Sequence, residues 1–296
     1  MKNKLISGII LLLTALIWGV AFVAQSVGMN YIGPFTFNCV RFMIGGIVLI
    51  PLIFFIESRK KENREKEERT KEKKNTIWGG IICGIFLCSA SSFQQIGILH
   101  TTVGKAGFIT ALYIVIVPLL GIFFHKRITI ALGSSTVIAT IGFYLLCISG
   151  NIQVNRGDFA ILICAFIFSL HILAIDYFSP KGNCVIISCI QFFVSAVISG
   201  FLMFLFEQPD ITQIMAAYIP ILYAGVLSCG VAYTLQIIGQ RNMEPAVASL
   251  ILCLESVFSA LAGWLILKQS LTVKELMGCM LVFVAVILAQ IPQKEK

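Results

Sequence analysis

The sequence predicts an all-α polytopic membrane protein, with ten transmembrane helices arranged as two inverted-topology repeats of five helices. The first observation is composition: of 296 residues, 58% are hydrophobic and 12% are charged, whereas soluble domains contain about 45–50% apolar and about 25% charged residues. The second is length, because the apolar residues form ten runs of about 20 residues, enough for helices that cross a hydrocarbon core of about 30 Å. The third is the odd number of runs in each half of the chain, which requires the two halves to insert in opposite orientations.

The predicted spans divide the chain into two similar parts. Residues 1–150 form the first five-helix repeat, with a charged cytoplasmic loop at 57–75, and residues 151–296 form the second. In chain order, the ten spans are Leu5–Val27, Pro34–Ile56, Thr76–Leu99, Ala106–Phe124, Ile128–Gly150, Phe159–Phe178, Cys184–Phe206, Ile219–Gly239, Pro245–Leu267 and Thr272–Ile291.

The distribution of Lys and Arg predicts the orientation of these spans. Most of the 22 basic residues fall in the loops that share a side with the N-terminus. On the opposite side only Lys105, Arg156, Lys268 and Lys274 occur. Because cytoplasmic loops are rich in Lys and Arg, both termini are expected in the cytoplasm of a multi-pass protein of the cell membrane. The net charge of +8 mostly reflects this asymmetry and does not indicate a nucleic-acid partner.

The first two spans carry isolated side chains deep within apolar runs. Trp18 lies too deep for an ordinary interfacial residue, so it either packs against a neighbouring helix, where Gly19 allows close approach, or forms an aromatic wall of a central cavity. Gln25 follows near the outer end of the same span. Arg41 lies in the second span, deep enough to need a carbonyl or carboxylate partner. It is either a structural clamp or a substrate contact.

A long polar run, from Glu57 to Lys74, follows the second span. Acidic residues precede basic ones by four positions there, which favours a solvated helical extension of the second span. The third span contains Gln94 and Gln95. In the fourth span, Pro118 removes a backbone hydrogen bond and favours a kink. The fifth span has no charged residue within it and is interpreted as scaffold.

The second half places two ionisable groups far from the membrane surfaces. His171 is either hydrogen-bonded structure or a proton carrier. Glu255 lies near the middle of the ninth span, where a carboxylate costs roughly 2.5 kcal/mol or more against lipid, so it must face protein or water, be paired, or be protonated. It is either a coupling group, protonated in one facing state and ionised in another, or a permanently satisfied packing acid.

Recurring spacings support two repeats. The interval from Trp18 to Arg41 recurs from Phe168 to Gln191 at an offset of 150 residues, and the interval from Gly84 to Gln95 recurs from Gly225 to Gln236 at an offset of 141. Transporters built from inverted repeats bind substrate near the midplane, between the repeats. The candidate cavity residues are Trp18, Gln25, Arg41, Gln95, Tyr113, His171, Gln236 and Glu255.

Several fragments indicate a family. The stretch LIWGVAFVAQ, the pair Arg41-Phe42, the segment GKAGFITALYIVIVPLLG, the pair Gly157-Asp158 and the segment LCLESVFSALAGWLILKQSLT resemble the drug/metabolite transporter superfamily, specifically the EamA-type ten-helix permeases. The chain keeps Glu255 but has Ser256 in place of the usual proline, and Lys268-Gln269 in place of a second acid. The resemblance implies alternating access by rocking of the two halves, with export of small metabolites or drugs.

The function expected from these features is secondary active transport of a small metabolite, such as an amino acid or a similar solute, or a drug, with protons as the candidate coupling ion. Import of a vitamin or nucleobase-like solute remains an alternative, as does a receptor or scaffold that transports nothing. An enzyme is not expected, because the three histidines are scattered and no H-E-x-x-H motif occurs. The ten cysteines are read as small apolar residues, neither a metal nor a cofactor is expected, and a homodimer is left open.

Overall fold

A computed structural model describes residues 2–59, 66–123, 129–147, 156–268 and 272–289. Within those ranges the secondary structure is helical, without a strand. The elements are α1 (Lys2–Gly28), α2 (Pro34–Arg59), α3 (Lys66–Ile98), α4 (Val103–Ala111), α5 (Tyr113–Phe123), α6 (Ile130–Cys147), α7 (Arg156–Phe178), α8 (Cys184–Phe206), α9 (Ile211–Ala216), α10 (Tyr218–Leu222), the π-helix η1 (Tyr223–Tyr233), α11 (Thr234–Gln240), α12 (Pro245–Leu252), α13 (Leu254–Leu267) and α14 (Val273–Ala289).

Each predicted span coincides with a helix or with a run of consecutive helices. Eight helical segments in the described part of the chain are long and apolar enough to cross a membrane, and α6 and α14 contain shorter apolar stretches. The fourth span is divided into α4 and α5, the eighth into α10, η1 and α11, and the ninth into α12 and α13. The prediction of an all-α polytopic membrane protein is confirmed.

The charged run after the second span is arranged differently from the prediction. The helix α2 ends at Arg59, and α3 begins at Lys66. The second half of the run, from Lys66 to Lys74, therefore belongs to the third helix, whereas Glu57–Arg59 extend the second. Glu67 and Glu68 lie in the first turn of α3, where negative charge interacts favourably with the helix dipole. Residues 60–65 of the predicted loop lie outside the described residues.

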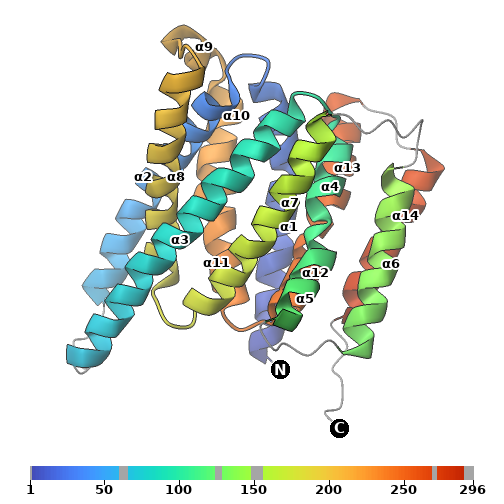
Figure 1. The fold of residues 1–296 in the computed structure, drawn as a ribbon, viewed down its shortest axis with the longest axis horizontal. Coiled ribbons are helices and arrows are strands. Elements are labelled where there is room, and N and C mark those ends of the chain that lie inside the picture. The colour runs from blue at the N-terminus through green and yellow to red at the C-terminus, as the bar shows by residue number, and fades with distance from the viewer. Residues whose placement is uncertain (1, 60–65, 124–128, 148–155, 269–271, 290–296) are drawn as a thin grey trace.

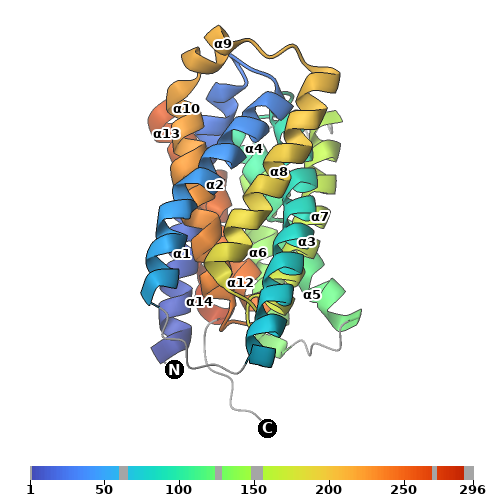
Figure 2. The same cartoon turned by 90° about the vertical axis from the view of Figure 1, so that its left-hand side faces the viewer.

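The two halves of the chain run in opposite directions through the helical bundle. In Figure 1, α1 leads away from the end of the molecule where both termini lie, whereas α7 leads toward that end. The helix α2 packs against α8, α6 against α14, and the α4 and α5 segments against α13 and α12. Other contacts between the halves also correspond: α3 packs against α7 as η1 and α11 pack against α1. Figure 2 shows α3 and α7 side by side.

Two close helix contacts occupy corresponding positions in the two halves. A Cβ atom placed on Gly84 would lie 2.9 Å from the Gln191 carbonyl oxygen and 2.7 Å from Val194 Cβ. A Cβ atom on Gly225, which is 141 residues later, would lie 3.1 Å from the Arg41 carbonyl oxygen and 2.8 Å from Ile44 Cβ. Arg41 and Ile44 each precede the contacts of Gly84 by 150 residues. Glycine at both places thus lets α3 approach α8 as closely as η1 approaches α2.

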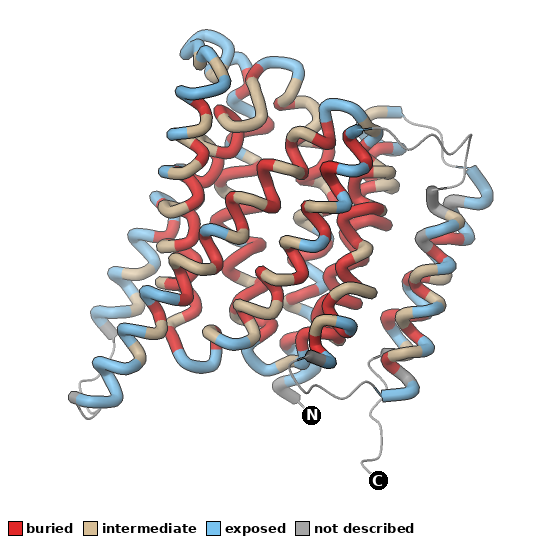
Figure 3. Tube along the Cα trace, viewed as in Figure 1, coloured by how far each residue is buried: buried red, intermediate tan, exposed pale blue. Residues whose placement is uncertain are grey.

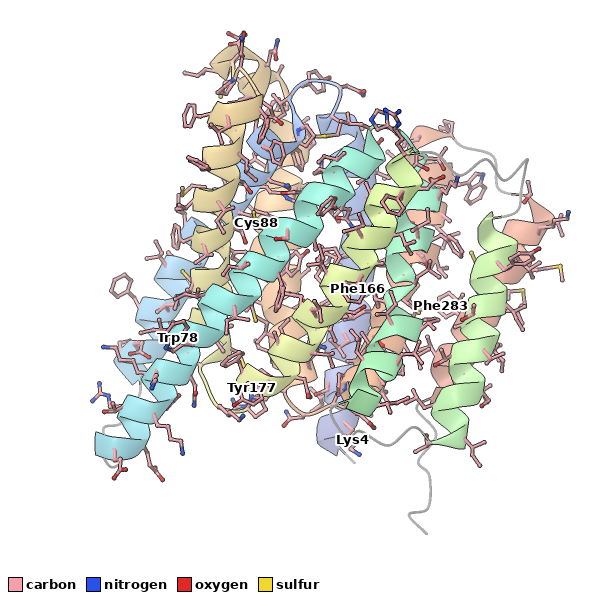
Figure 4. The ribbon with its side chains drawn as sticks, viewed as in Figure 1. Lys4, Trp78, Cys88, Phe166, Tyr177 and Phe283 are labelled. Carbon is pink, nitrogen blue, oxygen red and sulfur yellow. The ribbon has the colours of Figure 1, made fainter. Side chains whose placement is uncertain are left out.

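The outer surface is apolar along the sides of the bundle. Figure 3 shows buried residues concentrated in the middle of the helices and exposed residues toward their ends. Large exposed side chains include Trp78, Phe166 and Phe283, which are 52%, 47% and 37% exposed and are labelled in Figure 4. A surface of this kind is unfavourable in water and suited to lipid. The polar side chains inside the bundle are therefore the ones that need a functional or structural explanation.

Candidate functional site

A single cavity collects most of the polar side chains predicted for a site. Its volume is about 30 Å³, which holds only a few water molecules. Helices from both halves of the chain contribute to its wall. Six of the eight candidates line it, namely Trp18, Gln25, Arg41, Tyr113, Gln236 and Glu255.

The wall includes two helix interruptions at corresponding places. Leu112 separates α4 from α5 with φ −59° and ψ −12°, and Cys253 separates α12 from α13 with φ −62° and ψ −14°. In each case the peptide N–H three residues later donates to the carbonyl of the interrupting residue, at 3.0 Å for Val115 and 3.1 Å for Ser256. This tight turn shifts the helix register. It leaves Tyr113 and Glu255 at the first and second positions of the helices that follow.

The irregularity of the fourth span was expected at its proline. The structure instead places Pro118 inside α5 and the interruption at Leu112. The ninth span has the same kind of interruption, with Ser259 at the position that corresponds to the proline. In the ninth span, Ser249, Ser256 and Ser259 each donate a hydroxyl hydrogen bond to the carbonyl three residues earlier, a pattern that bends helices. A proline is therefore not the shared cause of the two interruptions.

Glu255 occupies one part of the cavity wall. The side chain is 4% exposed, and the hydroxyl of Tyr113 donates a hydrogen bond to its Oε1 atom at 3.0 Å. None of the described basic side chains lies within 4.0 Å of the carboxyl oxygens. The position of Glu255 is fixed by packing against α1, since a Cβ atom on Gly19 would lie 2.9 Å from the Glu255 carbonyl oxygen. The carboxyl is thus held by a neutral donor in the first turn of a helix.

Arg41 occupies another part of the wall and is 2% exposed. Its Nη1 atom donates to Gln25 Oε1 at 3.0 Å. Its guanidinium carbon lies 4.8 Å from the ring centroid of Phe42 and 5.6 Å from that of Phe37, distances typical of cation–π contacts. The Nε and Nη2 atoms are buried without a hydrogen-bond partner among the described residues.

Aromatic side chains form a further part of the cavity wall. The rings of Trp18 and Tyr233 have centroids 4.6 Å apart, and Phe22 and Phe168 also line the cavity. Trp18 Nε1 lies 3.4 Å from the carbonyl oxygen of Ser228, to which it donates. This carbonyl belongs to the π-helix η1, in which backbone hydrogen bonds span five residues in place of four. Turns of this kind are frequent at functional sites. Trp18 therefore both packs against its neighbour and forms part of the cavity wall.

Two predicted residues lie outside the cavity lining. Gln95 is fully buried, whereas its neighbour Gln94 lines the cavity and donates to Thr110 Oγ1 at 3.3 Å. His171 is also fully buried. Its Nε2 atom forms a hydrogen bond with Gln191 Oε1 at 3.1 Å, between α7 and α8. The ring of His171 lies behind the aromatic wall, in edge contact with Tyr233.

Sequence reasoning did not select several of the lining residues. Tyr233 precedes Gln236 by three positions, so its place on the same helical face was a usable signal. Phe168 corresponds to Trp18 at the offset of 150 residues, which was a second signal. The aliphatic residues in the wall carry no sequence signal that separates them from core or lipid-facing positions. The lining residues that were not predicted are Phe22, Gln94, Thr110, Phe168, Ile172, Ser228, Tyr233 and Leu252.

Two polar contacts join the halves at the end of the bundle opposite the termini (Figure 1). Glu207, at the end of α8, accepts hydrogen bonds from the backbone N–H groups of Phe35 and Thr36 at 2.8 Å and from the Thr36 hydroxyl at 2.6 Å. It therefore caps the start of α2, where a negative charge is favourable. Lys105 Nζ lies 2.6 Å from Asp158 Oδ2 and connects the first turns of α4 and α7.

Comparisons with known proteins agree with this arrangement. The model of the EamA-like transporter family matches twice, at residues 5–148 and 155–290. An "Uncharacterized transporter" of Archaeoglobus fulgidus is 30% identical over 291 residues, which cover 98% of this chain and 87% of the relative. The "Uncharacterized transporter YoaV" of Bacillus subtilis is 24% identical over 275 residues and 90% of both chains. A solved structure described only as "Crystal structure of protein" has a TM-score of 0.76 at 18% identity, over 96% of both chains, and shows the fold.

Proposed function

Because this chain belongs to the EamA-like transporter family and is a multi-pass membrane transporter rather than an enzyme, we propose that it moves a small metabolite across the cell membrane by secondary active transport. The solute is an amino acid, a similar small molecule or a drug. The observation that carries the proposal is a cavity whose wall is formed by helices of both halves and contains one buried carboxyl and one buried guanidinium group. Polar groups placed this deep in a membrane protein characteristically mark a solute or ion pathway.

Transport proceeds by alternating access, through rocking of two inverted repeats around the cavity. The opposite directions of α1 and α7, the corresponding helix contacts and the matching glycine contacts of Gly84 and Gly225 support this proposal. The cavity volume of about 30 Å³ is too small for an amino acid, so its walls must separate to admit one. The contacts of Glu207 and Lys105 join the halves at one end of the bundle, and opening toward that end requires these contacts to break.

The carboxyl group of Glu255 couples transport to protons. Its hydrogen-bond donor in the cavity is the neutral hydroxyl of Tyr113. Without a basic partner among the described residues, the net charge of this part of the wall changes by one unit whenever the carboxyl binds or releases a proton. A second positive group entering the cavity competes with that proton. This competition is the physical basis for exchange of a solute against protons.

Direction and orientation complete the proposal. The excess of Lys and Arg in the loops on the side of the N-terminus favours cytoplasmic termini. The contacts of Glu207 and Lys105 then lie at the outer face. Because the solute exchanges against protons, a proton gradient directed inward drives export of the solute.

Flux measurements in proteoliposomes test the proposal. A panel of labelled amino acids and small metabolites is assayed for uptake and for counterflow, with and without an imposed pH gradient. Wild-type protein is expected to move at least one solute. Glu255→Gln is expected to lose the component driven by the pH gradient and to retain counterflow at saturating solute concentration, because glutamine cannot bind and release a proton. The matched control is Glu244→Gln, since Glu244 is an exposed acid before α12 whose side chain makes no capping hydrogen bond. A Glu255→Gln variant that responds to the pH gradient like the wild type would contradict the coupling role, and absence of flux for the whole panel would contradict transport of these solutes.

A further inference from the structure

The guanidinium group of Arg41 is the least satisfied charged group in the described part of the bundle. It has five N–H hydrogens to donate. One of its nitrogen atoms, Nη1, donates to Gln25, while Nε and Nη2 are buried without a partner. No described carboxylate lies within 4.0 Å of the guanidinium. A buried cation in this state is strongly unfavourable, because it has lost its hydration without gaining a counter-charge.

The surroundings of Arg41 hold the guanidinium in place without neutralising it. The rings of Phe37 and Phe42 lie near the guanidinium, and Phe42 in turn stacks on Phe192 with centroids 6.2 Å apart. Gln25 contributes a neutral amide oxygen. A cation–π contact and one neutral hydrogen bond offset only part of the cost of burying a charge. The missing contribution is an anion.

Glu255 presents the complementary problem in the wall of the same cavity. Its carboxyl group receives a hydrogen bond from Tyr113 but lies within 4.0 Å of no described basic nitrogen. Arg41 and Glu255 therefore line one small cavity without pairing with each other. A molecule that carries a carboxylate and an ammonium group satisfies both residues at once.

We infer that Arg41 is the anchoring residue for the carboxylate group of a zwitterionic solute, whose ammonium group lies toward Glu255. The inference rests on the proposed transport function and specifies its substrate. Nε and Nη2 lie on one edge of the guanidinium, and such an edge binds both oxygens of a carboxylate in parallel. Trp18, Phe168 and Tyr233 also line the cavity, so the body of the solute is apolar. The substrate class is that of apolar α-amino acids.

The chemistry of the ligand can be tested on the wild-type protein alone. Purified protein is heated with L-leucine, L-methionine or L-phenylalanine, with the amide of each, with the N-acetyl derivative of each, or with additional sodium chloride in an otherwise identical buffer. The amino acids are expected to raise the melting temperature, and both derivatives are expected to lose most of that shift. An amide that stabilises as well as its parent acid would overturn the carboxylate site. A shift with chloride alone would assign the site to inorganic anions, and no shift with any of the three amino acids would overturn the substrate class.

Variants locate the effect at Arg41. Arg41→Gln is expected to weaken binding of the stabilising amino acid by about tenfold or more, because a charge-assisted pair is lost. Arg41→Lys keeps the charge but cannot form a bidentate contact, so its affinity for the amino acid is expected to lie between those of Arg41→Gln and wild type. Gln191→Leu is the matched control, since Gln191 corresponds to Arg41 in the second half and lies outside the cavity lining. Equal binding by wild type and Arg41→Gln would overturn the inference.

The outcome for binding is separable from the outcome for transport. Carboxylate-dependent stabilisation without flux in proteoliposomes would support the Arg41 site and contradict the proposed function. Flux of solutes that lack a carboxylate, unaffected by Arg41→Gln, would support transport and contradict the Arg41 site.

Discussion

Arg41 and Gln191 occupy corresponding positions in α2 and α8, yet they have different surroundings. Both are buried, and each bonds to a polar side chain of the preceding helix, Gln25 for Arg41 and His171 for Gln191. The backbone carbonyl of each lies near a glycine of the opposite half. Arg41 lines the cavity, however, and Gln191 does not. The two halves therefore share a packing scheme while only one of them supplies a cation to the site.

The interrupted helices show the same division. Leu112 and Cys253 have nearly equal backbone angles. The residue two positions after Cys253 is Glu255, whereas the residue two positions after Leu112 is Ile114. A repeated backbone places equivalent positions around the cavity, and substitution at individual positions then gives one half the guanidinium and the other the carboxyl. A transporter needs this asymmetry to orient a solute, whereas the rocking motion requires only that the packing be repeated.

The largest effect on stability is expected for valine substitutions at the two contact glycines, Gly84 and Gly225. Gly84→Val and Gly225→Val each force side-chain atoms toward a backbone carbonyl and a β-branched residue of the facing helix. We expect each variant to lose free energy of unfolding toward the upper end of the range of about 1–3 kcal/mol, measured as thermal unfolding in lipid nanodiscs. Gly104→Ala is the control, because a Cβ atom there has no neighbour within 4 Å. A loss in only one of the two valine variants would break the equivalence of the halves.

The sequence predicted the fold well because lipid imposes simple constraints on it. Runs of about 20 apolar residues locate the spans, and the spans coincide with helices. Six polar candidates lie around one cavity for a related reason: a polar side chain deep in an apolar run has few other places to go. Glu255 and Arg41 were found on that ground alone.

The parts that were not predicted depend on local geometry that hydropathy does not record. The interruption at Leu112 precedes Pro118 by six residues, and the one at Cys253 has no proline, so neither position has a simple sequence signature. The π-helix η1 rotates Ser228 by an amount that an α-helical period does not give. Gln94 and Gln95 are adjacent and equally polar, and helical rotation of about 100° per residue decides which of them lines the cavity.

A smaller effect is expected at the corresponding starts of α2 and α8, because a carboxylate caps α2 and an amide caps α8. Glu207 caps the start of α2, and the acid 150 residues earlier, Glu57, is exposed at the end of α2. At the start of α8, Asn183 accepts the corresponding backbone hydrogen bonds instead. Glu207→Ala is expected to cost about 1–2 kcal/mol of unfolding free energy, and Glu57→Ala a few tenths or less, measured by thermal unfolding. Equal losses would mean that the exposed carboxylate and the capping carboxylate contribute equally to stability, which would contradict this asymmetry.

The smallest effect is expected for the His171–Gln191 pair, which is the counterpart in the second half of the Gln25–Arg41 pair. His171 and Gln191 bond to each other, and each keeps a second buried nitrogen without a described partner. Replacing both partners with apolar residues removes the hydrogen bond together with the groups that require it, which can be nearly neutral. The double variant His171→Leu with Gln191→Leu is therefore expected to unfold within about 1 kcal/mol of wild type and to bind amino acids with unchanged affinity. If thermal-shift titrations instead show weakened binding, the pair acts on the cavity through Tyr233, whose ring His171 contacts. That result would contradict the view that Arg41 serves binding while Gln191 serves only packing.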